Sequence, residues 1–254
     1  MLWLLRAFRR LACTLMPTAC LCVFMEAAFG TPRDEDLFLR PEDMNTVLFG
    51  SLDVGRSMFL NVGSKRTLTG PLDRDGFVGM QANGLGLTRE RSELGGGIRT
   101  TRITAESSGL LGYQWTGNGV YAALFAGPEF HQEQLTIAAR AGRWSQPRPG
   151  FRGQAELWLN PTPVTLVTGT VVAGTTRGSL WARGSAGLKL WRNLYVGPEA
   201  ILYVTDTYRE TKFGGHLTGI DLGIIHLRVS AGVQTQSDRK DAAAYMALTS
   251  WIRL

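Results

Sequence analysis

The stretch Ser179–Arg209, SLWARGSAGLKLWRNLYVGPEAILYVTDTYR, predicts two long strands joined by a tight turn at Trp191-Arg192-Asn193. Its side chains alternate. One face of the second strand is apolar, and it consists of Leu194, Val196, Pro198, Ala200, Leu202 and Val204. The other face is mostly polar, with Ile201 as the exception, and it carries Tyr195, Glu199, Tyr203, Thr205, Thr207 and Arg209. A sustained period of two indicates a long strand with a different environment on each face. Soluble strands usually have about 5–6 residues and bilayer-spanning strands about 9–11, so the hairpin favours a transmembrane β-barrel.

The N-terminus has the features of a secretory signal peptide, which we predict over residues 1–30. Arg6, Arg9 and Arg10 form a positive region, the apolar run Leu11–Met25 follows, and Ala28-Phe29-Gly30 offers small residues for cleavage. A single membrane anchor is the weaker alternative, because the apolar run has about 15 residues and a spanning helix needs about 20.

Cysteine usage and charge narrow the class of protein. Cys13, Cys20 and Cys22 all lie in the predicted signal peptide, so the mature chain has no disulfide, thiolate metal site or catalytic thiol. The formal net charge is +6, and the basic residues are scattered among acidic ones. We therefore expect no nucleic-acid partner. No later apolar run is long enough for a membrane helix, so a membrane role would depend on strands.

The rest of the chain predicts one antiparallel domain. Residues 31–45 are polar and acidic with two prolines and are expected to be a flexible periplasmic lead-in, and 46–254 are expected to form the β-barrel domain. About twelve strands follow one another, and Gly117-Asn118-Gly119 is a strong hairpin signal. Loops are expected over 89–97 and, as the longest, 135–150. An even strand number is typical of outer-membrane barrels.

A secreted β-sandwich is the alternative fold, because its strands alternate as well. Long strands, bulky charges mixed with glycine on the polar faces, and aromatic residues near strand ends favour the barrel. Two similar segments, Gly127-Pro128-Glu129 and Gly197-Pro198-Glu199, each place a proline within a strand. Proline removes a ladder hydrogen bond, so each segment predicts a bulge or local bend with the glutamate on the polar side.

The polar faces predict a lumen with nearly balanced charge. The acidic residues on these faces are Asp53, Glu106, Glu129, Glu133, Glu156 and Glu199. The basic residues are Arg102, Arg152, Arg183, Lys189, Arg209, Lys212 and Arg228. Unpaired buried charges cost several kcal/mol, so these groups are expected to pair. A salt-bridged, largely plugged interior is favoured over a small polar passage.

Catalytic motifs are sparse. There is no Gly-x-Ser-x-Gly elbow, and the histidines at 131, 216 and 226 lack His-x-x-x-His spacing, so we expect no metal and no cofactor. One enzymatic alternative places His216 near Asp206 or Glu210, with Ser185 nearby. The candidate binding residues are polar side chains expected in the lumen: Glu129, Glu199, Arg183, Asp206, Arg209, Glu210 and His216.

Several short blocks, taken in chain order, carry a resemblance to a known family: Leu48–Gly55, Ser64–Arg66, Gly70–Asp73, Gly76–Gly79, Leu111–Trp115, Gly127–Glu129, Gln154–Trp158 and Gly197–Glu199. The most specific block is Thr205–Gly219. In this order the blocks resemble the BcsS family of cellulose biosynthesis proteins from alphaproteobacteria, and the resemblance covers about Thr46 to Leu254.

The resemblance implies an accessory, non-enzymatic protein of cellulose biosynthesis and secretion in the outer membrane. The implied partners are outer-membrane lipid and other proteins of cellulose synthesis or export, or cellulose itself. The resemblance carries over no catalytic residue. Two other functions remain open: an outer-membrane hydrolase or acyl-modifying enzyme acting on lipid or glycan, and a channel for small polar solutes.

Overall fold

The computed structural model describes residues 44–91, 99–137, 140–238 and 241–254. The predicted signal peptide (1–30) and most of the predicted lead-in (31–45) lie outside the described residues. The described residues belong to one compact unit. Within the described ranges, no helix is long and apolar enough to span a membrane.

The described residues form thirteen β-strands. In chain order they are β1 (Thr46–Val54), β2 (Ser57–Thr67), β3 (Gly76–Arg91), β4 (Arg99–Gly117), β5 (Val120–Ile137), β6 (Arg140–Trp144), β7 (Arg148–Leu159), β8 (Thr165–Gly174), β9 (Ser179–Trp191), β10 (Leu194–Val204), β11 (Arg209–Leu222), β12 (Ile225–Gln236) and β13 (Ala243–Arg253).

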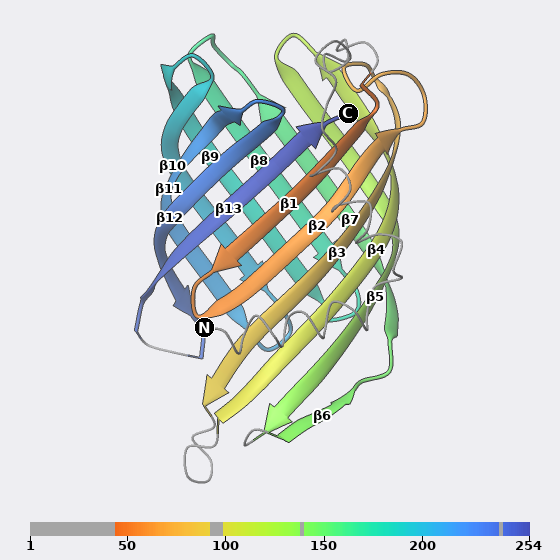
Figure 1. The fold of residues 1–254 in the computed structure, drawn as a ribbon, viewed down its shortest axis with the longest axis vertical. Coiled ribbons are helices and arrows are strands. Elements are labelled where there is room, and N and C mark those ends of the chain that lie inside the picture. The colour runs from red at the N-terminus through yellow and green to blue at the C-terminus, as the bar shows by residue number, and fades with distance from the viewer. Residues whose placement is uncertain (1–43, 92–98, 138–139, 239–240) are drawn as a thin grey trace. The chain divides into compact units, whose positions relative to one another are not determined.

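Twelve of these strands close into an antiparallel barrel (Figure 1). Each strand from β1 to β5 and from β7 to β13 pairs with its neighbours in the sequence of barrel strands, and β13 pairs with β1. The ring therefore has no free edge, and the prediction of about twelve strands in an outer-membrane-type barrel is confirmed. The sandwich alternative is wrong, because it would require two separate sheets.

The segment expected to be the longest loop is mostly strand. β5 continues to Ile137, where it still pairs with Thr100 of β4, and β6 folds back onto the end of β5. β7 then begins at Arg148 and pairs with His131. The loop prediction for 135–150 is therefore wrong, because tertiary pairing continues past the point at which the apolar alternation weakens. The first residues of the loop predicted over 89–97 are strand as well, since β3 extends to Arg91, and the rest of that range lies outside the described residues.

The two faces of each strand have different environments, as the alternation predicts. In β5, Leu124 and Phe130 are exposed on the outside, at 56% and 50%, while Phe125 and His131 are buried inside. Similar exposed apolar side chains occur around the ring, among them Leu111, Phe151, Leu188, Phe213, Val233 and Met246. Soluble monomers rarely expose an apolar surface this extensive, whereas a closed barrel in lipid requires one. The chain is therefore an outer-membrane protein that spans the bilayer with its strands.

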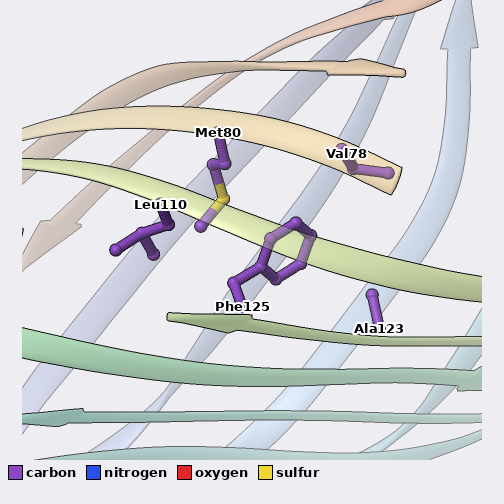
Figure 2. Packing of buried hydrophobic residues seen from close by; sticks show 5 residues of the cluster. All are labelled: Val78, Met80, Leu110, Ala123 and Phe125. Carbon is purple, nitrogen blue, oxygen red and sulfur yellow. The ribbon is translucent and has the colours of Figure 1, made fainter. Parts of the chain in front are cut away.

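The lumen beside β3, β4 and β5 holds an apolar cluster. Figure 2 shows its members, Val78, Met80, Leu110, Ala123 and Phe125. Each is at most 5% exposed. Phe49 and Tyr121 pack against the cluster from β1 and β5.

Both chain ends of the barrel meet at one rim, which we call the terminal rim. There the Leu254 carbonyl accepts hydrogen bonds from the Asn45 and Thr46 amides, each at 2.9 Å. The same rim carries the tight turns β4–β5, β9–β10 and β11–β12, as strand order requires. In the β4–β5 turn, Asn118 and Gly119 have φ of 47° and 79°, values that suit a two-residue hairpin, so the Gly-Asn-Gly prediction is confirmed. The other end, with the turns β1–β2, β8–β9 and β10–β11, is the opposite rim.

Candidate functional site

Polar and charged side chains fill much of the lumen and form the candidate site. They come from alternate positions of the strands, so the pattern that makes each strand amphipathic also directs these groups inward. They form several networks around different carboxylates, and many of the contacts join strands that are not neighbours in the barrel.

The Glu199 network lies inside the wall formed by β8–β13. The Glu199 side chain is fully buried, and its Oε2 accepts hydrogen bonds from Arg183 Nε at 2.8 Å and from Arg228 Nη2. Ser230 Oγ donates to the same oxygen at 3.2 Å. Arg228 also donates to Thr168 Oγ1 of β8 at 3.0 Å. The buried Arg228 guanidinium and the partly buried Arg183 guanidinium thus share one carboxylate, which stabilises both only while that carboxylate is ionised.

The Lys212 network lies nearer the opposite rim. Lys212 Nζ donates to both Asp53 carboxylate oxygens, at 2.7 and 2.8 Å, and lies 3.1 Å from Glu210 Oε1. Glu210 Oε2 accepts hydrogen bonds from Tyr208 Oη and Gln236 Nε2, each at 2.7 Å. Tyr208 lies in the turn before β11, and burial, together with the Glu210 carboxylate, raises the pKa of its phenol. This network has one cation for two carboxylates, whereas the Glu199 network has two cations for one carboxylate. The net charges of the two networks therefore offset each other.

The Lys65 network occupies the side of the lumen beside the apolar cluster. Lys65 of β2 pairs with Glu156 of β7, and Gln154 Nε2 donates to Glu156 Oε1 at 2.6 Å. The Lys65 ammonium lies 5.5 to 5.9 Å from the ring centroids of Phe49, Tyr121 and Phe125. These are cation–π distances, so the lysine interacts both with the three aromatic rings and with the Glu156 carboxylate.

A smaller set of contacts lies toward the opposite rim on β4, β5 and β7. Glu106 lies 3.4 Å from His131 Nδ1, its direct cross-strand neighbour, and 3.8 Å from Arg152 Nη1. Glu133 lies 3.3 Å from Arg102 Nη1. Glu129 instead accepts hydrogen bonds from the amide and hydroxyl of Thr176, at 3.1 and 2.8 Å.

Two tryptophans meet across the lumen near the terminal rim. The rings of Trp158 on β7 and Trp251 on β13 lie 5.6 Å apart at an interplanar angle of 71°. Five strands separate β7 from β13 in either direction round the ring, so this contact joins opposite walls. His226 stacks on Trp251 at 5.8 Å and 23°, and Asp221 Oδ1 lies 2.6 Å from His226 Nδ1. The aromatic contact therefore crosses the lumen from one wall to the opposite wall.

The Asp221 position depends on a β-bulge. Register between β11 and β12 shifts between Thr218 and Ile220, and Gly219 adopts a φ of 89°. Even positions of β11 face inward before the bulge, and the extra residue brings Asp221 opposite His226 on the inner face. Glycine adopts this φ without strain, which explains the residue at this position.

The two Gly-Pro-Glu segments behave alike. Both glutamates, Glu129 and Glu199, are buried on the inner face, as predicted. Pairing of each Gly-Pro with the preceding strand is interrupted, but the register on both sides is unchanged. The result is a gap in the ladder without an inserted residue, so the alternative of a bulge is wrong at both places.

Five of the seven predicted site residues belong to the inner face: Glu129, Glu199, Arg183, Glu210 and His216. They do not form a single site, because Glu129 contacts Thr176 while Glu210 belongs to the Lys212 network. His216 is 2% exposed, with Nδ1 2.8 Å from Thr218 Oγ1 and Nε2 3.3 Å from the Ala186 carbonyl.

The prediction is wrong for the other two, Asp206 and Arg209. Asp206 is exposed in the turn between β10 and β11. Arg209 pairs with the outward Val204 and is exposed. The sequence pattern predicts that the alternation continues through residues 205–208, but that segment is a turn, so the sequence of inward and outward positions starts again at β11. His216 is therefore not paired with Asp206.

Sequence reasoning missed Lys65 and the Trp158–Trp251 contact. Lys65 alternates with Thr67 and Gly63 on the inner face of β2, and that pattern could have placed it in the lumen. The tryptophan contact joins distant strands, so no local pattern predicts it. Within the described residues, no three His, Cys, Asp or Glu side chains come together in a way that could hold a metal ion.

Comparison with solved structures finds other barrels. The KdgM porin has 11% sequence identity and a TM-score of 0.43, with 82% of this chain and 99% of that chain covered. The translocator domain of the autotransporter NalP from Neisseria meningitidis has 11% identity and a TM-score of 0.44, covering 93% of this chain and 97% of that chain. None of the curated proteins compared with the chain matches it.

The family comparison agrees with the block order noted in the sequence. The family model described as cellulose biosynthesis protein BcsS matches residues 47–254, which includes every strand of the barrel except the first residue of β1. This chain therefore belongs to the BcsS family of cellulose biosynthesis proteins.

Proposed function

We propose that this chain is a non-enzymatic accessory barrel that assists cellulose secretion from a fixed position in the outer membrane. The observation that carries the proposal is that the lumenal charges are engaged with one another. Arg183 and Arg228 converge on Glu199, Lys212 joins Asp53 and Glu210, and Lys65 joins Glu156. A lumen built in this way stabilises the barrel and leaves its rims as the surfaces for partners.

The crossing contacts argue against a conduit for a glucan chain. Trp158 and Trp251 touch from opposite walls, and Arg228 spans from β12 to Thr168 of β8. A polymer would have to separate these pairs and leave buried charges without partners, which is costly. The role we propose is therefore assistance or anchoring at the membrane, with other proteins carrying out polymerisation and export.

The surroundings of His216 argue against hydrolysis at that residue. A general base needs a reachable substrate proton and commonly an acidic partner that orients it. His216 is buried, and its two ring nitrogens face Thr218 and a backbone carbonyl. This arrangement orients the ring for packing within the wall and leaves no carboxylate to orient it for catalysis.

The proposal includes the processing of the chain. Residues 1–30 would be removed during export as a signal peptide, and 31–45 would remain in the periplasm as a lead-in to the barrel at 46–254. The terminal rim would then face the periplasm, since the chain arrives from that side. Lipid would contact the outer band, and proteins of cellulose synthesis or export, or cellulose, would contact a rim.

The test is deletion of the gene followed by complementation. We expect deletion to reduce extracellular cellulose while cellulose synthase activity in isolated membranes stays unchanged, and the intact chain to restore the cellulose. The purified protein should migrate faster on gels before boiling than after boiling. Unchanged cellulose output and fibre properties after deletion would overturn the proposal.

A His216→Ala variant separates this function from the enzymatic one. We expect it to restore cellulose output if its barrel still shows heat-modifiable migration. A folded His216→Ala barrel that fails to restore output would favour catalysis. Single-channel conductance of the wild-type protein in planar bilayers would instead favour a solute channel.

A further inference from the structure

Polar side chains interrupt the apolar outer surface of β2, β3 and β4. We call Ser64, Gln81, Asn83 and Ser107 the outer polar patch. Ser64 pairs with Gln81 across β2 and β3, and Asn83 pairs with Ser107 across β3 and β4. These positions alternate with inward residues such as Met80 and Ser108, which are buried, so the patch faces outward. On the wall from β7 to β13 the outward side chains are mostly apolar, for example Leu157, Val171 and Leu188.

The patch lies within the apolar band and not at its edge. On the same outer face, Phe77 and Leu111 lie toward the terminal rim and are 50% and 56% exposed. Leu85 and Leu60, a cross-strand pair, lie toward the opposite rim. Apolar side chains on both sides place the patch at the depth of lipid hydrocarbon.

None of the four patch side chains makes a hydrogen bond to another described residue. Gln81 and Ser107 are exposed, and Asn83 and Ser64 are half-buried. Hydrocarbon offers no donor or acceptor, so carboxamides left facing lipid are unfavourable and mark a surface with another partner.

The outer surface is also hollowed at the patch. A hollow of about 460 Å³ is bordered by Ser64 and Gln81, and the glycines Gly79 and Gly109 lie beneath it. A side chain added at Gly109 would meet nothing within 4 Å. Small residues of this kind allow close approach of another protein surface in a membrane. A second hollow, of about 340 Å³ on β9–β11, lies among Ala182, Gly184 and Ala200, with Thr211 and Arg209 toward the opposite rim. It lacks carboxamides, and its apolar part suits acyl chains.

We infer that the outer polar patch is a contact surface for a second copy of this chain. Two barrels inserted in the same direction are related by a two-fold axis along the membrane normal, so each residue meets residues at its own depth. Polar groups at one depth therefore meet polar groups. Carboxamides and hydroxyls donate and accept hydrogen bonds, which makes the patch complementary to itself. Arg66, at the end of the hollow nearest the terminal rim, would remain at the membrane surface.

This inference goes beyond the accessory role and does not depend on cellulose. It assigns the wall at β2–β4 to dimer formation and leaves the wall at β9–β11 to lipid. The dimer would double the number of rims available to partners at one position in the membrane.

Cysteine cross-linking tests the contact directly. The natural cysteines, Cys13, Cys20 and Cys22, lie outside the barrel, and replacing them with alanine gives a chain without any thiol even if the signal peptide is not removed. Gln81→Cys, Asn83→Cys and Ser107→Cys are then made singly, with Ala200→Cys on the other wall as the matched control. Cells are treated with a mild oxidant, and the outer-membrane fraction is run on a non-reducing gel.

We expect at least one patch variant to give a band of twice the monomer mass, at least tenfold stronger than the Ala200→Cys band. The double variant Gln81→Leu/Asn83→Leu should lose the dimer, measured by light scattering in detergent, while keeping heat-modifiable migration. Cross-linking no stronger than the control would overturn the inference. So would a band whose mass identifies a different protein, or a double variant that remains dimeric.

The cellulose assay and the cross-linking assay fail independently. If the patch variants cross-link no more than Ala200→Cys but the chain still restores cellulose output, the dimer is excluded and the accessory function stands. If the patch variants cross-link strongly but deletion of the gene leaves cellulose output unchanged, the dimer stands and the accessory function is excluded.

Discussion

The wall formed by β3–β5 and the wall formed by β9–β12 fill the lumen in different ways. Inside β3–β5, an apolar cluster with Val78 and Phe125 lies toward the terminal rim and charged groups such as Glu106 lie toward the opposite rim, while the outer face carries Gln81 and Asn83 among apolar side chains. Inside β9–β12 the side chains are charged, with Glu199 and Arg228 at the centre, while the outer face is apolar. In both walls, inward and outward side chains alternate along each strand.

The comparison shows that alternation alone does not decide which face of a strand is inside. The closed ring and its register decide it, because neighbours that pair directly must share a face. Each wall then uses its inner face differently. The β9–β12 wall depends on charge pairing, and the part of the β3–β5 wall near the terminal rim depends on apolar packing, so these two regions should respond differently to truncation.

The largest effect is expected for Glu199→Ala. The change leaves Arg183 and Arg228 facing each other without their carboxylate, and breaking a buried pair typically costs about 3–5 kcal/mol. We expect a loss of this size in the free energy of unfolding, measured by denaturant titration of the refolded barrel in detergent. Removing one arginine as well, in Glu199→Ala/Arg228→Met, should recover part of the loss.

Glu129→Ala is the matched control. It removes the equivalent glutamate of the other Gly-Pro-Glu segment, which lies in β5. Glu129 accepts its hydrogen bonds from Thr176, and a neutral hydrogen-bond partner left unsatisfied costs about 1–3 kcal/mol. Equal losses for the two variants would mean that the arginines do not depend on Glu199, and the contrast between the walls would fail.

Phe125→Ala tests the apolar cluster, and we expect it to lower the free energy of unfolding by about 3 kcal/mol. The ring packs with Met80 and Leu110 in the lumen, and truncation leaves a cavity there. The value lies at the low end of the usual range because Lys65, now next to the ring, can move into part of the space. The same denaturant titration measures it.

Phe130→Ala is the control from the same strand, since this ring faces outward and is 50% exposed. Lipid can fill the space that it leaves, so its loss should be less than half that of Phe125→Ala. A larger loss at Phe130 would place the packed face of β5 on the outside.

Much of the fold follows from local sequence, because the barrel repeats one simple pattern. The hairpins at Asn118 and Arg192 lie where turn residues predicted them, and both positions adopt a positive φ. The inward glutamates of the two Gly-Pro-Glu segments were also predictable. In each case the signal lies within a few residues of the feature.

The rest required information from distant strands. Trp158 and Trp251 come together only because twelve strands close the ring, and Asp221 faces inward only because the bulge at Gly219 shifts its phase. The extension of β5 by pairing with β6 likewise depends on a partner strand. Which residues of β11 face inward after the turn at 205–208 also depends on pairing with another strand. The local pattern therefore predicts the wrong face for Arg209.

The smallest effect is expected for Arg209→Ala, and it tests which residues of β11 face inward. Arg209 is exposed on the outward side of β11, while Lys212 faces inward on the same strand and binds Asp53. An exposed side chain away from buried networks contributes within about 0.5 kcal/mol, so unfolding should be nearly unchanged. Lys212→Ala, three residues along the strand, should cost several times more, because it leaves Asp53 and Glu210 close together without their cation. A loss for Arg209→Ala as large as that for Lys212→Ala would mean that alternation does continue through the turn. The inner face of β11 would then be the opposite one, and the charged wall would have to be rebuilt around different residues.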